Sequence, residues 1–208
     1  MNQRTPRTPP RTREQERLAA LTAAVNLALI RNTDLRAALQ ECTDALVAHA
    51  GAAFARIWTL DEQANALELQ ASSGMYTHID GAHSRVPMGK FKIGLIAEER
   101  KPHLTNSVVG DPRVGDQEWA AREGMAAFAG YPLIVEDKLV GVMAMFSRTA
   151  LTEGAIRAME AVAHGVASGI ERKHAEGALI GALANAGQYA RQLRDLAVSA
   201  SEINASLS

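Results

Sequence analysis

The sequence predicts an α+β fold in which a central antiparallel sheet is flanked by helices near both ends of the chain. Short apolar runs rich in Val, Ile, Leu, Met and Phe gather between residues 52 and 147. Residues 14–50 and 152–208 instead repeat their apolar residues at intervals of three and four, which is the period of an amphipathic helix. Within 126–147, two apolar runs flank a charged break at 136–138, which indicates two paired strands joined by a tight turn.

The N-terminal part divides into a tail and a linker helix. Residues 1–13 contain three prolines, four arginines and no apolar cluster, so we expect a disordered tail. Residues 14–34 predict a linker helix, because Leu18, Leu21, Val25 and Leu29 lie along one face.

A second helix is expected from residue 35 to Gly51. Asp34 or Thr33 can cap its N-terminus, and Gly51 suits its C-terminus. One apolar stripe follows its length, formed by Leu35, Leu39, Cys42, Leu46 and Ala50. This stripe would pack on the sheet, which makes buried packing the favoured role of Cys42.

Strands and short helices are expected between residues 52 and 147. Phe54–Leu60 and Ala66–Ala71 form two strands, and residues 73–93 form an irregular excursion with several glycines and a proline. A short helix follows over 93–100, and a brief strand lies near Leu104. A helical turn over 116–123 is capped by Asp116 and carries Trp119.

The closing hairpin is expected to lie in the middle of the sheet. Val140, Val142, Ala144 and Phe146 fall on one face of its second strand by simple alternation, and Leu139, Met143 and Met145 fall on the other. A strand with apolar residues on both faces is covered on both faces. Helices or loops should therefore lie on both sides of the sheet.

Residues 152–208 predict one long helix that begins at a Thr152 cap. The later part of this helix, 173–208, predicts a coiled-coil-like linker from the spacing of its apolar residues. Its stripe consists of Leu179, Ala182, Ala186, Tyr189, Leu193, Leu196, Ala200, Ile203 and Leu207. Gly177 and Gly181 lie where this stripe changes phase from the earlier one, so a stutter or local bend is expected there.

Composition limits the classes of function. The 208 residues allow one domain plus extensions, and the net charge of -1 argues against nucleic acid as a partner. No apolar run is long enough to span a bilayer, and the N-terminus has no secretory h-region. The single cysteine cannot form an internal disulfide, so the expected compartment is the cytoplasm.

Residues 94–147 resemble part of a known family. The segment GYPLIVEDKLVGVMAMFS, preceded by Gly110-Asp111-Pro112-Arg113 and by Glu118-Trp119-Ala120, is similar to the last strands of a GAF domain. The resemblance covers residues 35–172. It implies a GAF-like antiparallel sheet of about six strands, and a ligand held between the sheet and the loops of residues 74–124.

The candidate ligand-binding residues are aromatic and histidine side chains of that region, because pockets are usually apolar with a few polar groups. They are Tyr76, His78, His83, Phe91, His103, Trp119, Phe128 and Tyr131. Any one of the aromatic residues could instead belong to the core. No catalytic motif of the nucleophile-elbow, zinc-protease, P-loop or C-x-x-C type is present, so no catalytic residue is assigned.

The histidines of this region raise the question of a metal site or a bound cofactor. His78, Asp80 and His83 could ligate a divalent metal, but their spacing matches no standard site. A polar loop whose histidines cap turns is the favoured interpretation, and no metal is assigned. The bilin-attaching cysteine and the cyclic-nucleotide signature of the resembled family have no counterpart. Haem bound through a histidine stays open, so the cofactor is unknown.

The resemblance implies a small-molecule-sensing input domain of a multidomain signalling protein. The chain would form a homodimer and couple a ligand to an output domain, absent from this chain, through its C-terminal helix. The parent would be a two-component histidine kinase or a cyclic-nucleotide-signalling enzyme, and the domain itself is expected not to be an enzyme. Two alternatives remain, a ligand-free dimerisation scaffold and a small enzyme on the same fold. A sulfoxide reductase, for example, would need redox cysteines in the pocket.

Overall fold

The computed structural model describes residues 12–206, with side chains described up to residue 194. The chain forms two compact units, of which the first ends at Ile170 and the second begins at Glu171. Residues 1–11 of the expected tail lie outside the described part of the chain. So do the side chains of Leu196, Ala200 and Ile203 and all of Leu207 in the predicted stripe.

One six-stranded antiparallel sheet forms the centre of the first unit, as predicted. The strands are β1 (Phe54–Asp61), β2 (Ala66–Gly74), β3 (Arg85–Pro87), β4 (His103–Thr105), β5 (Ala127–Val135) and β6 (Lys138–Ser147). They lie in the order β3-β2-β1-β6-β5-β4. The hairpin of β5 and β6 is therefore central, because β6 pairs with both β1 and β5. The short edge strand β3 lies inside the segment that the sequence predicts to be irregular.

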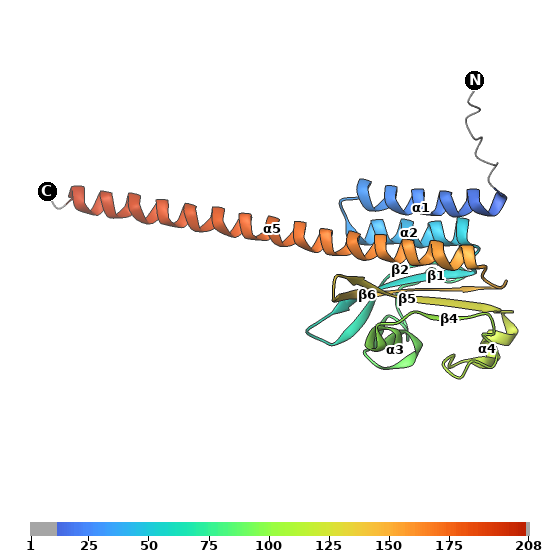
Figure 1. Ribbon diagram of the computed structural model, residues 1–208. Coiled ribbons are helices and arrows are strands. Elements are labelled where there is room, and N and C mark those ends of the chain that lie inside the picture. The colour runs from blue at the N-terminus through green and yellow to red at the C-terminus, as the bar shows by residue number, and fades with distance from the viewer. Residues whose placement is uncertain (1–11, 207–208) are drawn as a thin grey trace, which may run out of the picture. The chain divides into compact units, whose positions relative to one another are not determined.

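Helices cover both faces of this sheet (Figure 1). On one side lie α1 (Arg13–Arg31), α2 (Leu35–Ala50) and the first part of α5 (Glu153–Ser206). On the other side lie α3 (Phe91–Glu99) and α4 (Gln117–Arg122) with the loops around them. No helix within residues 12–206 has the length and hydropathy that crossing a membrane would require.

The helix ends follow the local signals of the sequence. Thr12 and Gln15 form a capping box at the start of α1, and the Asp34 carboxylate accepts the backbone N–H of Ala37 at the start of α2. Gly51 ends α2 with a φ of 75°, in the left-handed region that glycine adopts without steric cost. Thr152 caps α5 as expected.

The two faces of the sheet bury separate cores. The core under α1, α2 and α5 contains the stripe of α2 together with Tyr131, Met143 and Met145. The opposite core, toward α3 and α4, contains Phe54 and Phe128. Two-sided burial of the hairpin is therefore confirmed, and it gives each side of the sheet a separate environment.

Simple alternation predicts the wrong face for two residues of β6. Leu133 pairs with Gly141 and Ile134 pairs with Leu139, so Val140 is an extra, bulged residue. Leu139 consequently packs in the core toward α3 and α4, and Val140 packs in the core under α5. The sequence-based assignment placed these two residues the other way round, because a bulge shifts the two-residue period of the strand by one.

Candidate functional site

A cavity of about 610 Å³ lies between the sheet and the segments that carry α3 and α4. Its walls are mainly aromatic, with rings from β1, from the segment after β2, from α3 and α4, and from β5 and β6. These rings belong to Phe54, Trp58, Tyr76, Phe91, Trp119, Phe128 and Phe146. The volume falls in the range of pockets that hold metabolites or drug-sized molecules.

The aromatic rings support one another. Phe54 stacks on Phe146 with ring centroids 5.1 Å apart, and its other neighbours Tyr76 and Trp119 meet it edge-on. The indole N–H of Trp119 donates to the Tyr76 hydroxyl at 2.8 Å, and that of Trp58 donates to the His83 carbonyl at 3.0 Å. Both indole donors are thus satisfied within the wall. A ligand meets a largely apolar aromatic surface.

Arg56 of β1 is the most unusual polar residue of this wall. It is only 8% exposed, yet no carboxylate among the described residues lies within ion-pair distance of it. Its Nε donates to Ser72 Oγ at 3.1 Å, and the Ser72 hydroxyl donates to the Tyr76 carbonyl at 2.7 Å. Its guanidinium also lies over the rings of Phe54 and Tyr76, 5.6 and 5.7 Å from their centroids, where cation–π attraction stabilises it.

Burial and charge shift two pKa values at this end of the cavity. The pKa of Arg56 lies below its ordinary value because burial disfavours the charged form. The pKa of His83 is lowered as well, first by burial and then by the positive charge of Arg56. His83 is therefore neutral near pH 7, since its ordinary pKa is about 6.5.

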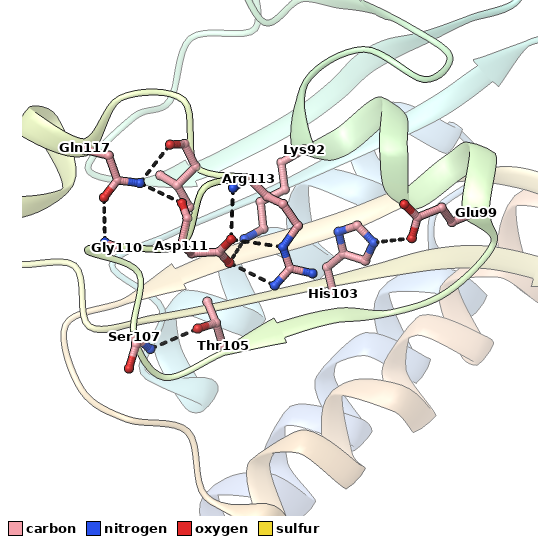
Figure 2. A network of polar contacts seen from close by, with 10 residues as sticks. Lys92, Glu99, His103, Thr105, Ser107, Gly110, Asp111, Arg113 and Gln117 are labelled. Carbon is pink, nitrogen blue, oxygen red and sulfur yellow. Dashed lines mark hydrogen bonds and ion pairs between the residues drawn. The ribbon is translucent and has the colours of Figure 1, made fainter.

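A second charged group holds the loop between β4 and α4 (Figure 2). Asp111 accepts a hydrogen bond from Lys92 Nζ at 2.7 Å and two from the Arg113 guanidinium at 3.0 Å. The side chains of Lys92 and Asp111 are 8% and 5% exposed, whereas Arg113 is partly open to solvent. The pKa of the Asp111 carboxyl lies far below its usual range, chiefly because of the Arg113 hydrogen bonds. Lys92 also lies over Phe128, 4.3 Å from the ring centroid.

Gln117 fastens the same loop from the first residue of α4. Its side-chain carbonyl accepts the backbone N–H of Gly110 at 2.7 Å, and its amide nitrogen donates to the carbonyls of Asp111 and Val114. Figure 2 shows these bonds beside the Asp111 cluster. The loop that contributes Pro112 to Asp116 to the cavity wall is thus fixed to α3 and to α4.

Six of the eight predicted residues line the cavity. They are Tyr76, His78, His83, Phe91, Trp119 and Phe128. Tyr131 lies on the opposite face of β5, where its hydroxyl donates to the Ile156 carbonyl of α5 at 3.0 Å. Residues 128 and 131 are three apart on one strand, so the alternation of side chains turns them to opposite faces.

His103 also lies outside the cavity wall. It belongs to the edge strand β4, and its Nε2 lies 2.8 Å from the Glu99 carboxylate at the end of α3 (Figure 2). Its Nδ1 is buried and has no hydrogen-bond partner among the described residues. The loop histidines His78 and His83 reach the cavity without a metal cluster, since the described residues contain no group of three His, Cys, Asp or Glu side chains placed to hold an ion.

The sequence prediction missed the cationic residues of the cavity wall, which are Arg56, Lys92 and Arg113. A signal for the first two exists in the sequence. Arg56 interrupts the apolar strand FARIWTL, and Lys92 interrupts the apolar helix FKIGLIA. A charged residue inside an apolar run is rarely fully buried unless it is paired or serves a site. Phe146, predicted as core, is also part of the wall.

Cys42 lies apart from this cavity. The thiol is fully buried on α2, in the core on the other side of the sheet. Burial raises the pKa of the Cys42 thiol to about 12. The chain has no other cysteine, so the cavity wall contains no thiol.

Comparisons with known proteins identify what this architecture is similar to. Residues 32–171 match the family model of a GAF domain. The GAF domain of a phosphoenolpyruvate-protein phosphotransferase from Coxiella burnetii is similar with a TM-score of 0.69 and 19% identity, over 80% of this chain and 99% of that one. A methyl-accepting chemotaxis protein gives a TM-score of 0.58 and 19% identity, over 72% of this chain and 96% of that one. No curated protein matches the sequence.

One further structural neighbour corrects an expectation. The free methionine-R-sulfoxide reductase from Neisseria meningitidis, solved in complex with its substrate, is similar with a TM-score of 0.65 and 16% identity, over 82% of this chain and 97% of that one. Enzymes therefore occur on this fold. The expectation that this domain is not an enzyme was wrong, because it rested on the lack of familiar catalytic motifs, which does not exclude an enzyme on this fold.

Proposed function

The chain belongs to the GAF domain family, and we propose that it is the small-molecule-sensing input domain of a multidomain signal-transduction protein. Its partner in the same polypeptide would be an output domain such as a histidine kinase. The observation that carries the proposal is the aromatic cavity of about 610 Å³. A preformed cavity of this size, with few polar groups aimed into it, is the usual form of a small-molecule site.

The sheet provides the route from the cavity to α5. Phe128 of β5 lines the cavity, and three residues later Tyr131 of the same strand donates its hydroxyl to the Ile156 carbonyl of α5. Similarly, Phe146 faces the cavity while its neighbour Met145 packs in the core that α5 shares. A ligand that displaces β5 or β6 therefore also changes the surface on which α5 packs.

The signal requires a ligand that binds two arrangements of the domain unequally. A ligand with equal affinity for both arrangements shifts neither. The loop from Asp111 to Asp116 lines the cavity and is bonded to α3 and to α4, so a ligand that shifts this loop would also act on both helices. We propose that closure of this loop over the ligand favours one packing of β5, β6 and the first part of α5.

Self-association completes the proposal. Beyond Ile170, α5 exposes large apolar side chains, which are Leu179, Ile180, Leu183, Tyr189 and Leu193. An exposed apolar stripe at helical spacing suits a second copy of the same helix. We propose a homodimer in which paired α5 helices carry the change to paired output domains.

A ligand screen by native mass spectrometry tests the sensing proposal. The full chain is incubated with a metabolite mixture, and bound compounds are identified by their added mass. The variant Ala144→Phe serves as the test of location, because Ala144 lines the cavity on β6 and a larger side chain would fill it at a cost of about 1–3 kcal/mol. Ala37→Phe, on an exposed part of α2, is the matched control.

We expect bound compounds in the wild type and in Ala37→Phe, and their loss in folded Ala144→Phe. Circular dichroism checks that each variant is folded. A wild-type chain that retains no compound from the mixture, or compounds that bind Ala144→Phe equally well, would contradict the proposal.

A further inference from the structure

We propose that the cavity recognises a small monocarboxylate with an apolar body, and that Arg56 is the residue that binds its carboxylate. This inference rests on the proposed function, since it names the chemical class of the ligand for the same cavity. Two observations support it: one buried arginine has hydrogen-bond donors without partners, and the charges around this arginine leave one positive charge over.

Arg56 has donors to offer. An arginine side chain carries five N–H donors and accepts none, and in this structure only the Nε donor of Arg56 has a partner, Ser72 Oγ. The two terminal nitrogens have no hydrogen-bond partner among the described residues, and the residue lines the cavity. A planar guanidinium with both terminal nitrogens open is the geometry that holds a carboxylate by two parallel bonds.

The other cations of the wall are already occupied. Lys92 and Arg113 both donate hydrogen bonds to Asp111, so each of these two cations already has a carboxylate partner within the protein. Asp116, the acidic residue of the wall, accepts the backbone N–H of Trp119 as the cap of α4. Arg56 is thus the one cation of the described cavity wall without an acidic partner.

The count of charges favours a monoanion. The wall and the residues directly behind it contain three cations, Arg56, Lys92 and Arg113, and two carboxylates, Asp111 and Asp116. His83 is neutral at pH 7 and adds no charge. One positive charge remains, which a single carboxylate neutralises and a phosphate dianion exceeds. A buried charge left over is costly, so the matched monoanion is the favoured partner.

The rest of the wall determines the body of the ligand. Phe54 and Tyr76 lie beneath the guanidinium, and Phe146 and Trp119 continue the aromatic surface from there. These groups offer almost no further hydrogen-bond donors, because both indole N–H groups are already bonded within the protein. A hydrocarbon or aromatic body attached to the carboxylate suits this surface.

Three probes of one shape test the inference. They are 4-phenylbutanoate, the neutral 4-phenylbutanamide and the cationic 4-phenylbutylamine. Binding to the full chain is measured by isothermal titration calorimetry and by tryptophan fluorescence, since both tryptophans of the chain line the cavity. A phenyl ring absorbs at shorter wavelength than indole and leaves that signal clear.

We expect the carboxylate to bind roughly 10- to 100-fold more tightly than the amide, the range that hydrogen bonds to a charged group contribute, and the amine to bind least. Arg56→Gln should remove this preference while binding the amide as before. Arg56→Lys, which keeps the charge, should retain part of it. Arg36→Gln makes the same change on the exposed surface of α2 and should leave the preference intact.

Two kinds of result overturn the inference, and they differ in what they say of the sensing proposal. Equal affinity for carboxylate and amide in the wild type, or an unchanged preference in Arg56→Gln, overturns the assignment of Arg56 and leaves the cavity a binding site. No binding of any of the three probes at millimolar concentration overturns the inference and counts against a small-molecule cavity as well.

Discussion

At the scale of single residues, Asp111 makes the polar contacts that hold one side of the cavity wall in place. It is the shared acceptor for buried Lys92 and for Arg113, and through its backbone carbonyl it is also bonded to Gln117. Removal of this carboxylate would leave the Lys92 ammonium buried without a counter-charge. Such a loss costs more than the intact pair contributes, because the remaining charge has no water to solvate it.

We therefore expect Asp111→Asn to lower the free energy of unfolding by about 3–5 kcal/mol at pH 7. Arg113→Gln is the control and should cost less than about 1 kcal/mol, since the Arg113 side chain is 42% exposed. Urea unfolding followed by circular dichroism measures both. Equal losses in the two variants would contradict the role given to burial of Lys92.

The same residue gives a pH dependence. The pKa of Asp111 is lower in the folded protein than the unfolded value of about 3.9, so its stabilisation is fully present above that value and is lost as the pH falls toward the folded pKa. The advantage of the wild type over Asp111→Asn should stay constant from pH 7 to 5. It should then shrink by up to about 1.4 kcal/mol per pH unit below about pH 4. An advantage that grows on acidification would reverse the sign and contradict the argument.

Cys42 permits a second test at this scale. Its thiol is fully buried and its pKa is raised to about 12, so almost no thiolate exists in the native protein below pH 10. We expect a thiol reagent to label the native chain only through unfolding, so that labelling is slower than that of the denatured chain at the same pH by about the equilibrium constant of unfolding. Rapid stoichiometric labelling in the absence of denaturant would show that α2 does not cover the thiol.

At the scale of elements, Gly169 is the glycine of α5 that lies nearest to a side chain of α1. A Cβ built there would lie 2.6 Å from Cδ2 of Leu29, whereas at Gly165, about one turn earlier, its nearest neighbour would be Asn26 Oδ1 at 3.8 Å. The first distance is a clash and the second is an ordinary contact. The two glycines thus differ in packing while they share one helix.

Alanine substitution separates these two glycines. Gly165→Ala should raise the free energy of unfolding by up to about 1 kcal/mol, the difference in helix propensity between the two residues. Gly169→Ala should lower it, because the clash with Leu29 exceeds that gain. Thermal and urea unfolding measure both changes. A stabilised Gly169→Ala would contradict this prediction and would show that the Leu29 side chain moves aside at little cost.

Sequence patterns predicted the helices more fully than the sheet. Caps such as Asp34, Gly51 and Thr152 act on neighbours within a few residues, so the helix ends are visible in the sequence. The bulge at Val140 is different in kind, because it exists only in the register between β5 and β6. The edge strand β3 is three residues long and depends on its pairing with β2, so no local pattern reveals it.

The candidate site shows the same division. Tyr76, Phe91 and Trp119 could be predicted because they stand in a loop and in short helices, where packing alone does not explain them. Phe54, Trp58 and Phe146 stand in strands, where an aromatic residue indicates core, and they were not predicted. Arg56 is visible in the sequence only as an interruption of an apolar run, since its burial and its contacts depend on Ser72 and Tyr76, sixteen and twenty residues away in the chain. Tyr131 suits a pocket wall by residue type, but the alternation of β5 places it beneath α5.

At the scale of the whole molecule, the residues of α5 beyond Ile170 form a separate unit with exposed apolar side chains. Leu179, Leu183 and Leu193 are 61–68% exposed. An apolar stripe of this kind is stabilised when a second helix covers it. Self-association of the chain should therefore depend on this unit.

We expect removal of residues 178–208 to weaken dimerisation while the unit that ends at Ile170 stays folded, because that unit has its own two cores. Analytical ultracentrifugation at tens of micromolar measures the first effect and circular dichroism the second. A monomeric full-length chain, or a shortened chain that associates equally well, would remove the C-terminal stripe from the account of assembly.

The separate cores on the two faces of the sheet also affect how such a domain can diversify in evolution. Substitutions at Phe128, Ala144 or Phe146 change the shape of the cavity. Substitutions at Tyr131, Met143 or Met145 change the core on which α1, α2 and α5 pack. Because the two sets alternate along the same strands without sharing side chains, the cavity can change by substitution while the surface under the helices is inherited unchanged. On the proposed function, a new ligand specificity could in this way arise without a change in the surface on which α5 packs.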